Sequence, residues 1–329
     1  EIMPSLVGSE MCIRDRGRSA WRLYYGGGRG AHDSCAANPT LRKNEFTACA
    51  ACGMLPVNPY DKDIGMTSTD PAAWIGSGER QADALDPGHA ARIAATLGGP
   101  APAQGDPLPP LWQWAFFIST VSLDGLGTDG HPARGGFLPP AHDRNRMWAG
   151  GRVQFLHPLR VGVPAERISA VAEVKEKAGR SGALLFVTVR HEYRQQGELA
   201  ILEEQDIVYR QPTPPKLTGT EPAPQAQWRD PVEPSAVLLF RYSAVTFNGH
   251  RIHYDHPYVT GTEGYPGLVV HGPLIATEMV AAFQRARPNA RPTHLTYRGL
   301  RPLISPAPFH VAGRIEQAGV AQLLSLIHI

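Results

Sequence analysis

The stretch Tyr242–Asp255 reads YSAVTFNGHRIHYD, and Tyr265–Leu274 shortly after it reads YPGLVVHGPL. Together they place a histidine-rich loop directly before an apolar, periodic stretch. Proline favours the first turn of a helix, and a later proline, Pro288, marks where the period stops, so the pattern predicts a helix over Pro273–Arg287. We therefore expect a helix N-terminus next to the histidines.

Strand-like segments lie on both sides of this expected helix. Val237–Val245, His294–Leu303 and Phe309–Ile315 are short runs rich in apolar and β-branched residues. Runs of this length are typical of strands, so we interpret each as one. The block from residue 235 to residue 322 thus predicts one helix packed on a small sheet.

An earlier block, residues 66–210, has a similar make-up. Asp86–Leu97 predicts a short amphipathic helix, with Asp86 as its N-cap, Pro87 at its first position and Gly98 beyond its end. Four strands are expected later in this block: Arg152–Leu159, Arg167–Glu176, Ala183–Tyr193 and Glu198–Tyr209. The turns between the last three are short, which predicts an antiparallel meander.

The two blocks are separated by residues 211–234, which hold seven prolines without an apolar period and are interpreted as a linker. A weak internal echo relates the blocks, because Gln154–Leu159 (QFLHPL) resembles Arg298–Leu303 (RGLRPL). Such self-similarity suggests a duplicated α+β fold with an N-terminal half and a C-terminal half.

The two ends of the chain lack these patterns. Residues 1–65 show no helical or strand period, so we expect them to be a non-native or disordered leader. Met3–Arg16 (MPSLVGSEMCIRDR) and Leu323–Ile329 (LLSLIHI) resemble translated sequencing-adaptor scars. Fewer residues follow Pro302 than follow Pro158 in the first half, so the second half is expected to be C-terminally truncated, lacking two strands and leaving an unpaired sheet edge.

A competing interpretation of the leader is a zinc ribbon. His32, Cys35, Cys49 and Cys52 have the paired spacing that tetrahedral zinc sites use. No strand pattern surrounds these residues, so we expect no metal site in this chain. All four cysteines lie in the first 52 residues, which is typical of a protein from a reducing compartment.

Composition excludes several classes of partner. The 32 basic and 30 acidic residues give a formal charge of +2, without the excess of positive charge that nucleic-acid binding needs. The most apolar run, Pro266–Phe283, is interrupted by polar residues and is too short for a membrane span. We find no secretory signal, so the expected location is the cytoplasm and the expected partner is a small molecule.

The histidine-rich stretch is similar to the hydratase motif of the MaoC-like hotdog superfamily. In that motif an Asp lies five residues before a His that is followed by x-Asp, and a His-Gly pair opens the central helix. His253, Asp255, His271 and Gly272 match it, and Asn248 stands where many members have the Asp. The sequence of Thr246–Asp255 is more similar still to that of the type 2 hydroxyacyl-thioester dehydratase branch, which includes mesaconyl-CoA hydratases.

The resemblance covers residues 66 to about 317 and implies a fold and an activity. The expected fold is a double hotdog, α+β, with two antiparallel sheets each wrapped around a central helix. The expected enzyme is an acyl-CoA hydratase or 3-hydroxyacyl-thioester dehydratase, a carbon–oxygen lyase. It would hydrate a 2-enoyl-CoA of the mesaconyl-CoA kind or dehydrate a 3-hydroxyacyl thioester.

Chemistry supports such a set of residues independently of the family. Adding water to an enoyl thioester requires a group that moves protons and a donor for the enolate oxygen. The imidazole of His253 suits the first task, and a backbone N–H at Gly272, on the positive end of a helix, suits the second. A lone histidine is more often structural, and it is the complete motif that favours catalysis here. An amide cannot accept a proton, so Asn248 is expected to orient water or the imidazole.

The remaining site residues have two open interpretations each. Arg298 and Arg301 are candidate contacts for the phosphates of CoA, or else solvated strand-edge charges. His271 is a candidate substrate-binding residue that could instead pack or bond a backbone carbonyl. Asp255 is expected to cap a turn, and His250 to be solvated.

Three further expectations concern function. No metal or redox cofactor is expected, since CoA enters as part of the substrate. The substrate is expected to be an acyl-CoA or an acyl-carrier thioester, with no nucleic acid or membrane partner and a homodimer as the candidate assembly. The alternatives are a hotdog acyl-CoA thioesterase and a non-catalytic acyl-thioester-binding subunit.

Overall fold

The computed structural model describes residues 21–27, 70–141, 144–179, 182–211, 217 and 224–327. In these ranges the strands are β1 (Trp21–Gly27), β2 (Gly78–Asp83), β3 (Asn145–Phe155), β4 (Ala165–Gly179), β5 (Gly182–Gln195), β6 (Glu198–Arg210), β7 (Trp228–Val232), β8 (Ala290–Arg298), β9 (Phe309–Gln317) and β10 (Val320–Ile327). The α-helices are α1 (Pro87–Leu97), α2 (Ala236–Val245), α3 (His256–Gly261) and α4 (Gly272–Ala286). The zinc-ribbon residues and Met66 lie outside the described ranges.

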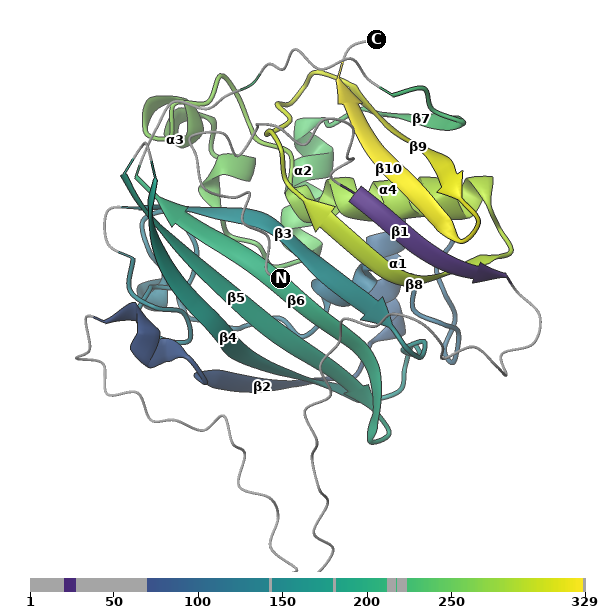
Figure 1. Cartoon of the computed structure of the whole chain (residues 1–329), viewed down its shortest axis with the longest axis horizontal. Helices are drawn as coiled ribbons and strands as arrows, with labels where there is room; N and C mark the ends of the chain where they lie inside the picture. The colour runs from purple at the N-terminus through teal and green to yellow at the C-terminus, as the bar shows by residue number, and fades with distance from the viewer. Residues whose placement is uncertain are drawn as a thin grey trace, which may run out of the picture.

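One sheet runs through the molecule, with its strands in the order β2-β4-β5-β6-β3-β8-β1-β10-β9-β7 (Figure 1). Strands β3 and β8 meet at its centre in antiparallel pairing. In chain order, the five strands of the first half are β2, β3, β4, β5 and β6. Outward from β3, the sheet contains the fifth, fourth, third and first of them, which are β6, β5, β4 and β2. Outward from β8, the second half has β1, β10, β9 and β7 in the same four places. Strand β7 thus lies at the far edge of the second half, as β2 does in the first. The expected double hotdog, α+β fold is thus present, but the two sheets expected for its halves form one continuous sheet because β3 pairs with β8. The echo marks the ends of these matching strands.

The position of the fifth strand along the sequence differs between the halves. In the first half β6 lies between β5 and β3, and it directly follows β5 in sequence. In the second half β1 lies between β10 and β8 and is antiparallel to both, as β6 is to its neighbours. Trp21 and Leu23 of β1 are buried. The prediction that nothing before Met66 joins the core is therefore wrong for Trp21–Gly27.

Two predictions about the second half fail for the same reason. Leu323–Ile327, which resemble a scar, form most of β10 and pair with Phe309–Gly313 of β9. With β10 and β1 both in the sheet, the expected unpaired edge beside β9 is absent from the described strands. Sequence resemblance to an adaptor does not prevent an apolar segment from pairing, because the ladder of a sheet is made by backbone groups.

Two other elements differ from expectation. Val237–Val245, predicted to be a strand, belongs to helix α2, because Ser235 caps the helix by accepting from the Leu238 N–H and a short apolar run suits either structure. The expected linker contains strand β7, which pairs with β9. The meander β4-β5-β6 and helices α1 and α4 are confirmed.

Each half has one helix that fills its core. The buried side chains of α1 include Ile93, which belongs to the same apolar cluster as Tyr193 and Ile201 of the first half. Helix α4 packs against β7, β9 and β10 (Figure 1). Its Met279 and Phe283 side chains are fully buried. No helix in the described ranges has both the length and the apolar character that crossing a membrane requires.

Candidate active site

The N-terminus of α4 lies where the two halves meet. His271 is its N-cap residue and makes no side-chain hydrogen bond to the helix, so the first-turn N–H groups are not capped by this residue. These groups carry the positive end of the helix dipole. Gly272 packs against Trp148 of β3 so closely that an added Cβ would lie 2.6 Å from Trp148 Cε3. Only glycine fits at this position without displacing the indole.

His253 ends a short 3-10 turn, Arg251–His253, that precedes α3. Its Nδ1 lies 2.7 Å from the carbonyl oxygen of Val269. A carbonyl can only accept, so Nδ1 carries the proton and Nε2 keeps its lone pair. Among the residues that the structure describes, Nε2 has no hydrogen-bond partner. This nitrogen is therefore free to act as a base.

Burial determines the protonation of His253. The residue is 7% exposed, and burial lowers its pKa to about 4, against the smaller upward effect of the bond to Val269. The ring stacks on His271, with centroids 3.7 Å apart and planes 19° from parallel. At neutral pH both imidazoles are uncharged, because burial also takes the pKa of His271 well below its ordinary value.

His271 is fully buried beneath His253. Its Nε2 lies at hydrogen-bonding distance, 2.8 Å, from Ser243 Oγ of α2. It therefore bonds a side chain rather than the backbone carbonyl considered from the sequence. Its substrate-binding role stays a prediction, and these contacts favour a role in holding the His253 ring.

Asn248 lies five residues before His253, and no hydrogen bond joins the two side chains in the described ranges. Its Oδ1 accepts from the backbone N–H of His250 at 3.0 Å, closing an Asx turn. That turn brings His250 next to His253, with ring centroids 5.4 Å apart. Its expected orienting role stays a prediction, and the contact observed acts on His250.

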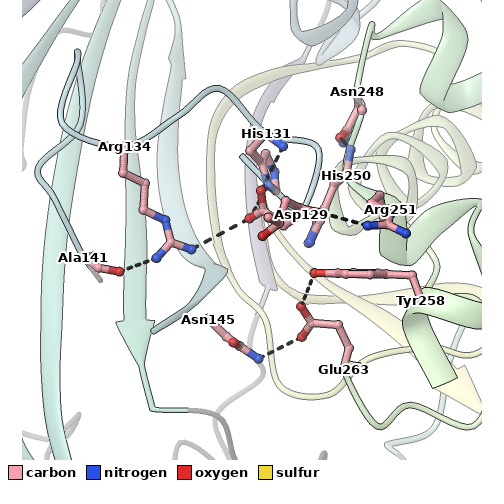
Figure 2. A network of polar contacts seen from close by, with 12 residues as sticks. Asp129, His131, Arg134, Ala141, Asn145, Asn248, His250, Arg251, Tyr258 and Glu263 are labelled. Carbon is pink, nitrogen blue, oxygen red and sulfur yellow. Dashed lines mark hydrogen bonds and ion pairs between the residues drawn. The ribbon is translucent and has the colours of Figure 1, made fainter. Parts of the chain in front are cut away.

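A second group of polar residues, absent from the sequence-based site, adjoins these histidines (Figure 2). His131 donates from Nδ1 to Asp129 Oδ2 at 3.2 Å, and its ring lies 4.1 Å from that of His250. His250, expected to be solvated, is instead packed between His131 and His253. We call Asp129, His131 and His250 the polar triad.

The charge state of the polar triad follows from its surroundings. Burial alone would raise the pKa of Asp129, but its hydrogen bonds from His131 hold that pKa below the ordinary value. Burial lowers the pKa of His131 and of His250, so both rings are neutral at neutral pH. One potential ligand atom from each residue lies within 4.8 Å of the others, a spacing that a metal ion could bridge.

The triad combines both halves, since Asp129 and His131 come from the first half and His250 from the second. The loop that carries Asp129 and His131 also contains Gly125–Gly130. This segment has the glycine spacing of a dinucleotide-binding motif, but no helix directly follows it in the described chain. The signal available in the sequence was Asp129-Gly130-His131, an acidic residue and a histidine within a glycine-rich segment. These residues form a site only because they lie close to His250, 119 positions after His131, and no local pattern reveals this contact.

The loop after α3 is tied to β3. Glu263 accepts from Asn145 Nδ2 at 2.8 Å and from the hydroxyl of Tyr258 at 3.0 Å (Figure 2). The guanidinium of Arg251 lies 4.0 Å above the Tyr258 ring.

Asp255 has the structural role expected of it. One carboxylate oxygen accepts from the Tyr258 N–H and caps α3, while the other accepts from Arg251 at 2.7 and 2.9 Å. Both oxygens are thus engaged, and Asp255 is not available as a second acid.

Arg298 and Arg301 lie near the same helix end. Arg298 pairs with Gly150 of β3, one residue beyond the Trp148–Ala149 dipeptide. Arg301 lies two residues before Leu303, whose carbonyl accepts from the Val270 N–H at 2.8 Å. Both arginines are half-buried. Their contact with CoA phosphates stays a prediction.

Comparison with known proteins identifies the family of the chain. The sequence profile of the family "Hydroxyacyl-thioester dehydratase type 2" matches residues 111–305, more than half of the chain. A mesaconyl-C(4)-CoA hydratase from Chloroflexus aurantiacus is 46% identical over 257 residues, which cover 76% of this chain and 90% of the relative.

Two more distant relatives extend the likeness. The mitochondrial hydroxyacyl-thioester dehydratase type 2 of Schizosaccharomyces pombe is 27% identical over 231 residues, 60% of this chain and 76% of the relative. A crystal structure of a MaoC-like dehydratase from Phytophthora capsici has the same fold, with a TM-score of 0.56 at 15% identity over 76% of this chain and 90% of that one. The chain therefore belongs to the hydroxyacyl-thioester dehydratase type 2 family.

Proposed function

We propose that this protein adds water reversibly to a 2-enoyl thioester, with His253 moving the protons and the N-terminus of α4 binding the enolate oxygen. The observation that carries the proposal is the pairing of a buried, neutral imidazole whose Nε2 is free with an uncapped helix N-terminus at Gly272. The family and the hydratase named among its relatives point to the same reaction.

In the hydration direction, the Nε2 of His253 takes a proton from water as the water oxygen attacks the β-carbon. The electron pair of the double bond moves toward the thioester, and the oxygen of the resulting enolate accepts from the Gly272 N–H. The imidazolium then returns the proton to the α-carbon. Water is the only species added, and carbon is not oxidised or reduced overall, so we propose that no redox cofactor takes part.

The low pKa of His253 fits the hydration direction. A base with a pKa of about 4 is unprotonated at neutral pH, and its Nδ1–H bond to Val269 fixes the ring so that Nε2 alone reacts. The imidazolium formed during the reaction is costly in a buried position and returns its proton readily. Burial therefore shortens the life of the charged intermediate state.

We further propose a short dicarboxylic acyl-CoA, of the kind named for the 46%-identical relative, as the substrate. Arg298 and Arg301 are proposed to bind the CoA phosphates, because they lie beside the helix end that receives the thioester. A CoA thioester is proposed over a carrier-protein thioester on the same ground.

The test is an absorbance assay of the enoyl thioester bond across a panel of enoyl-CoA substrates, with product analysis. Native protein should consume the double bond without releasing thiol, whereas thiol release would identify a thioesterase instead. His253→Ala should lower kcat on the order of 100-fold or more, as for loss of a general acid/base, with unchanged circular dichroism. His89→Ala is the matched control, since His89 lies in α1 and contacts the Ala115 carbonyl; it should keep near-native kcat.

A further inference from the structure

Arg146 lies on β3, two residues before Trp148. Side chains alternate along a strand, so these two share one face, about 7 Å apart. Trp148 contacts Gly272 at the N-terminus of α4, and Arg146 pairs in register with the buried Tyr209. The face that carries Arg146 thus faces the interior where the two halves meet.

Arg146 differs from three nearby arginines that already have an acidic neighbour. Arg134 contacts Asp129, Arg251 pairs with Asp255, and Arg152 pairs with Glu204 and Asp206. Within the described ranges, half-buried Arg146 has no hydrogen-bond or ion-pair partner. A guanidinium that is partly removed from water without an acid beside it lacks a counter-ion that a ligand could supply.

The guanidinium lies near the polar triad. After burial, the charge of Arg146 is the largest influence that lowers the pKa of His131, and it also lowers the pKa of His250. From His131 the rings lead to His250 at 4.1 Å and on to His253 at 5.4 Å. A ligand group held at Arg146 and these rings would therefore lie within a short acyl chain of the proposed base.

The chemistry of the proposed substrate class fits this spacing. In a half thioester of fumarate or mesaconate, the β-carbon that water attacks also carries a free carboxylate. The thioester oxygen would sit at Gly272 and the carboxylate at the opposite end of a four-carbon chain. Trp148 packs on Gly272, and Arg146 lies two residues before Trp148 on the same face of β3, so its guanidinium would lie at that opposite end.

A metal ion is the main rival occupant. The ligand atoms of the polar triad are close enough for one. However, Asp129 Oδ2 already accepts from His131 at 3.2 Å and lies 3.8 Å from Arg134. With Arg146 nearby as well, the site holds two guanidinium groups and one carboxylate, a net positive charge. A dication would add to this positive charge, whereas an anion would balance it.

We propose that Arg146, with His131 and His250 beside it, forms a subsite that binds the free carboxylate of a dicarboxylic acyl thioester. The inference rests on the proposed function and deepens it, since it assigns the residue that selects the substrate. The subsite would draw the carboxylate end of the chain toward the polar triad and leave the double bond beside His253.

The test compares substrates matched in length. Fumaryl-CoA and crotonyl-CoA differ in having a carboxylate or a methyl group at the far end. For native protein, kcat/KM should favour fumaryl-CoA by tenfold or more. Arg146→Gln should lower kcat/KM for fumaryl-CoA roughly tenfold to a hundredfold, the range for a hydrogen bond to a charged group, and leave crotonyl-CoA within about twofold.

Arg152→Gln is the matched control on the same strand, because Arg152 already pairs with Glu204 and Asp206. It should leave the selectivity unchanged. An equal fall for both substrates in Arg146→Gln would overturn the proposal and assign the residue to CoA binding or to the fold. No fall for either substrate would overturn it as well.

A binding measurement separates this inference from the proposed function. Succinyl-CoA and butyryl-CoA are saturated analogues that cannot be hydrated. Titration calorimetry should show tighter binding of succinyl-CoA to native protein, and Arg146→Gln should remove that preference. If native protein hydrates no enoyl-CoA, the proposed function fails, while this preference still decides the carboxylate subsite; equal binding of the two analogues would reject it.

Discussion

The two halves have the same arrangement of strands and helix, yet the N-termini of α1 and α4 differ in chemistry. In α1 the N-cap Asp86 accepts from the His89 N–H at 2.7 Å, placing a carboxylate on the positive end of the helix. In α4 the N-cap is the neutral His271, which leaves that end uncapped by a side chain. A capped end stabilises the fold, whereas an uncapped one can receive an oxyanion. Duplication of the fold therefore does not duplicate the site.

The halves also differ in how their fifth strand is supplied. β6 follows β5 directly, so the first half closes through local turns. β1 precedes the second half by more than 200 residues in sequence, and Trp21 pairs with Leu323 of β10. The second half thus depends on a strand that must be brought in from a distance, at a greater cost in chain entropy. It should be the more easily disrupted half.

Leu23→Ala should produce the largest effect on stability and tests the role of β1. Leu23 is fully buried between β8 and β10, so removing its side chain should lower the free energy of unfolding by about 2–5 kcal/mol. Tyr24→Ala, on the other face of the strand and 37% exposed, is the control and should cost clearly less. Urea unfolding followed by tryptophan fluorescence measures both. Equal midpoints for native protein and Leu23→Ala would show that β1 does not complete the sheet.

Acidification should destabilise the protein through its buried histidines. The folded pKa of His253, about 4, lies below its unfolded value near 6.5, so between these values the unfolded state binds a proton that the folded state does not. Stability should therefore be complete above about pH 6.5 and fall by about 1–3 kcal/mol as the pH drops toward 4. His253→Gln should flatten the slope of stability against pH by about one proton in this window. An unchanged slope would mean that His253 is not buried in its neutral form.

Gly272→Ala should act on turnover and tests the contrast between the helix ends. The new Cβ would lie 2.6 Å from Trp148 Cε3 and disturb the helix end that receives the oxyanion, so kcat should fall roughly 10- to 100-fold. Gly88→Ala makes the same change near the start of α1, where the new Cβ would meet only the Asp86 carboxylate, at 3.0 Å, and should leave kcat unchanged. Unfolding midpoints of both variants separate a fall in kcat from loss of fold. Native kcat in a folded Gly272→Ala variant would remove the helix end from the mechanism.

Local sequence signals predicted the elements whose ends are marked by capping residues, proline or glycine. Asp86, Pro87 and Gly98 mark both ends of α1, and Gly98 has the left-handed conformation, φ 78°, of a helix end. The apolar run at Val237–Val245 has no such mark except Ser235, and it was assigned to the wrong class because length alone does not separate a short helix from a strand.

Features that depend on distant pairing could not be predicted. No pattern within Trp21–Gly27 indicates that this segment pairs with residues near position 320 and completes the sheet. Of the site, His253, His271 and Gly272 lie together as their sequence spacing suggested. Asp129, His131 and Arg146 join them only through the contact of the two halves, which a single sequence does not encode in any local period.

Asn248 is expected to give the smallest effect and separates two accounts of the motif. If Asn248 orients the catalytic water, Asn248→Ala should lower kcat strongly. The structure instead has its Oδ1 accepting from the His250 N–H, so we expect a loss of only severalfold, as for a turn that loses one hydrogen bond of about 1 kcal/mol. The pH dependence of kcat should not move, because no charge is removed.

Asn248→Asp keeps that acceptor and adds a negative charge beside the histidines. It should restore kcat toward the native value, while the new charge favours the imidazolium and shifts the acid limb of the pH–rate profile upward. Because His250 and His253 are neighbours, this limb belongs to the pair rather than to one ring. A folded Asn248→Ala variant with a 100-fold loss of kcat would instead place the amide on the reacting water. In that case the second half would hold its base and its water-binding group on the same loop, and Asp129 and His131 of the first half would serve the substrate alone.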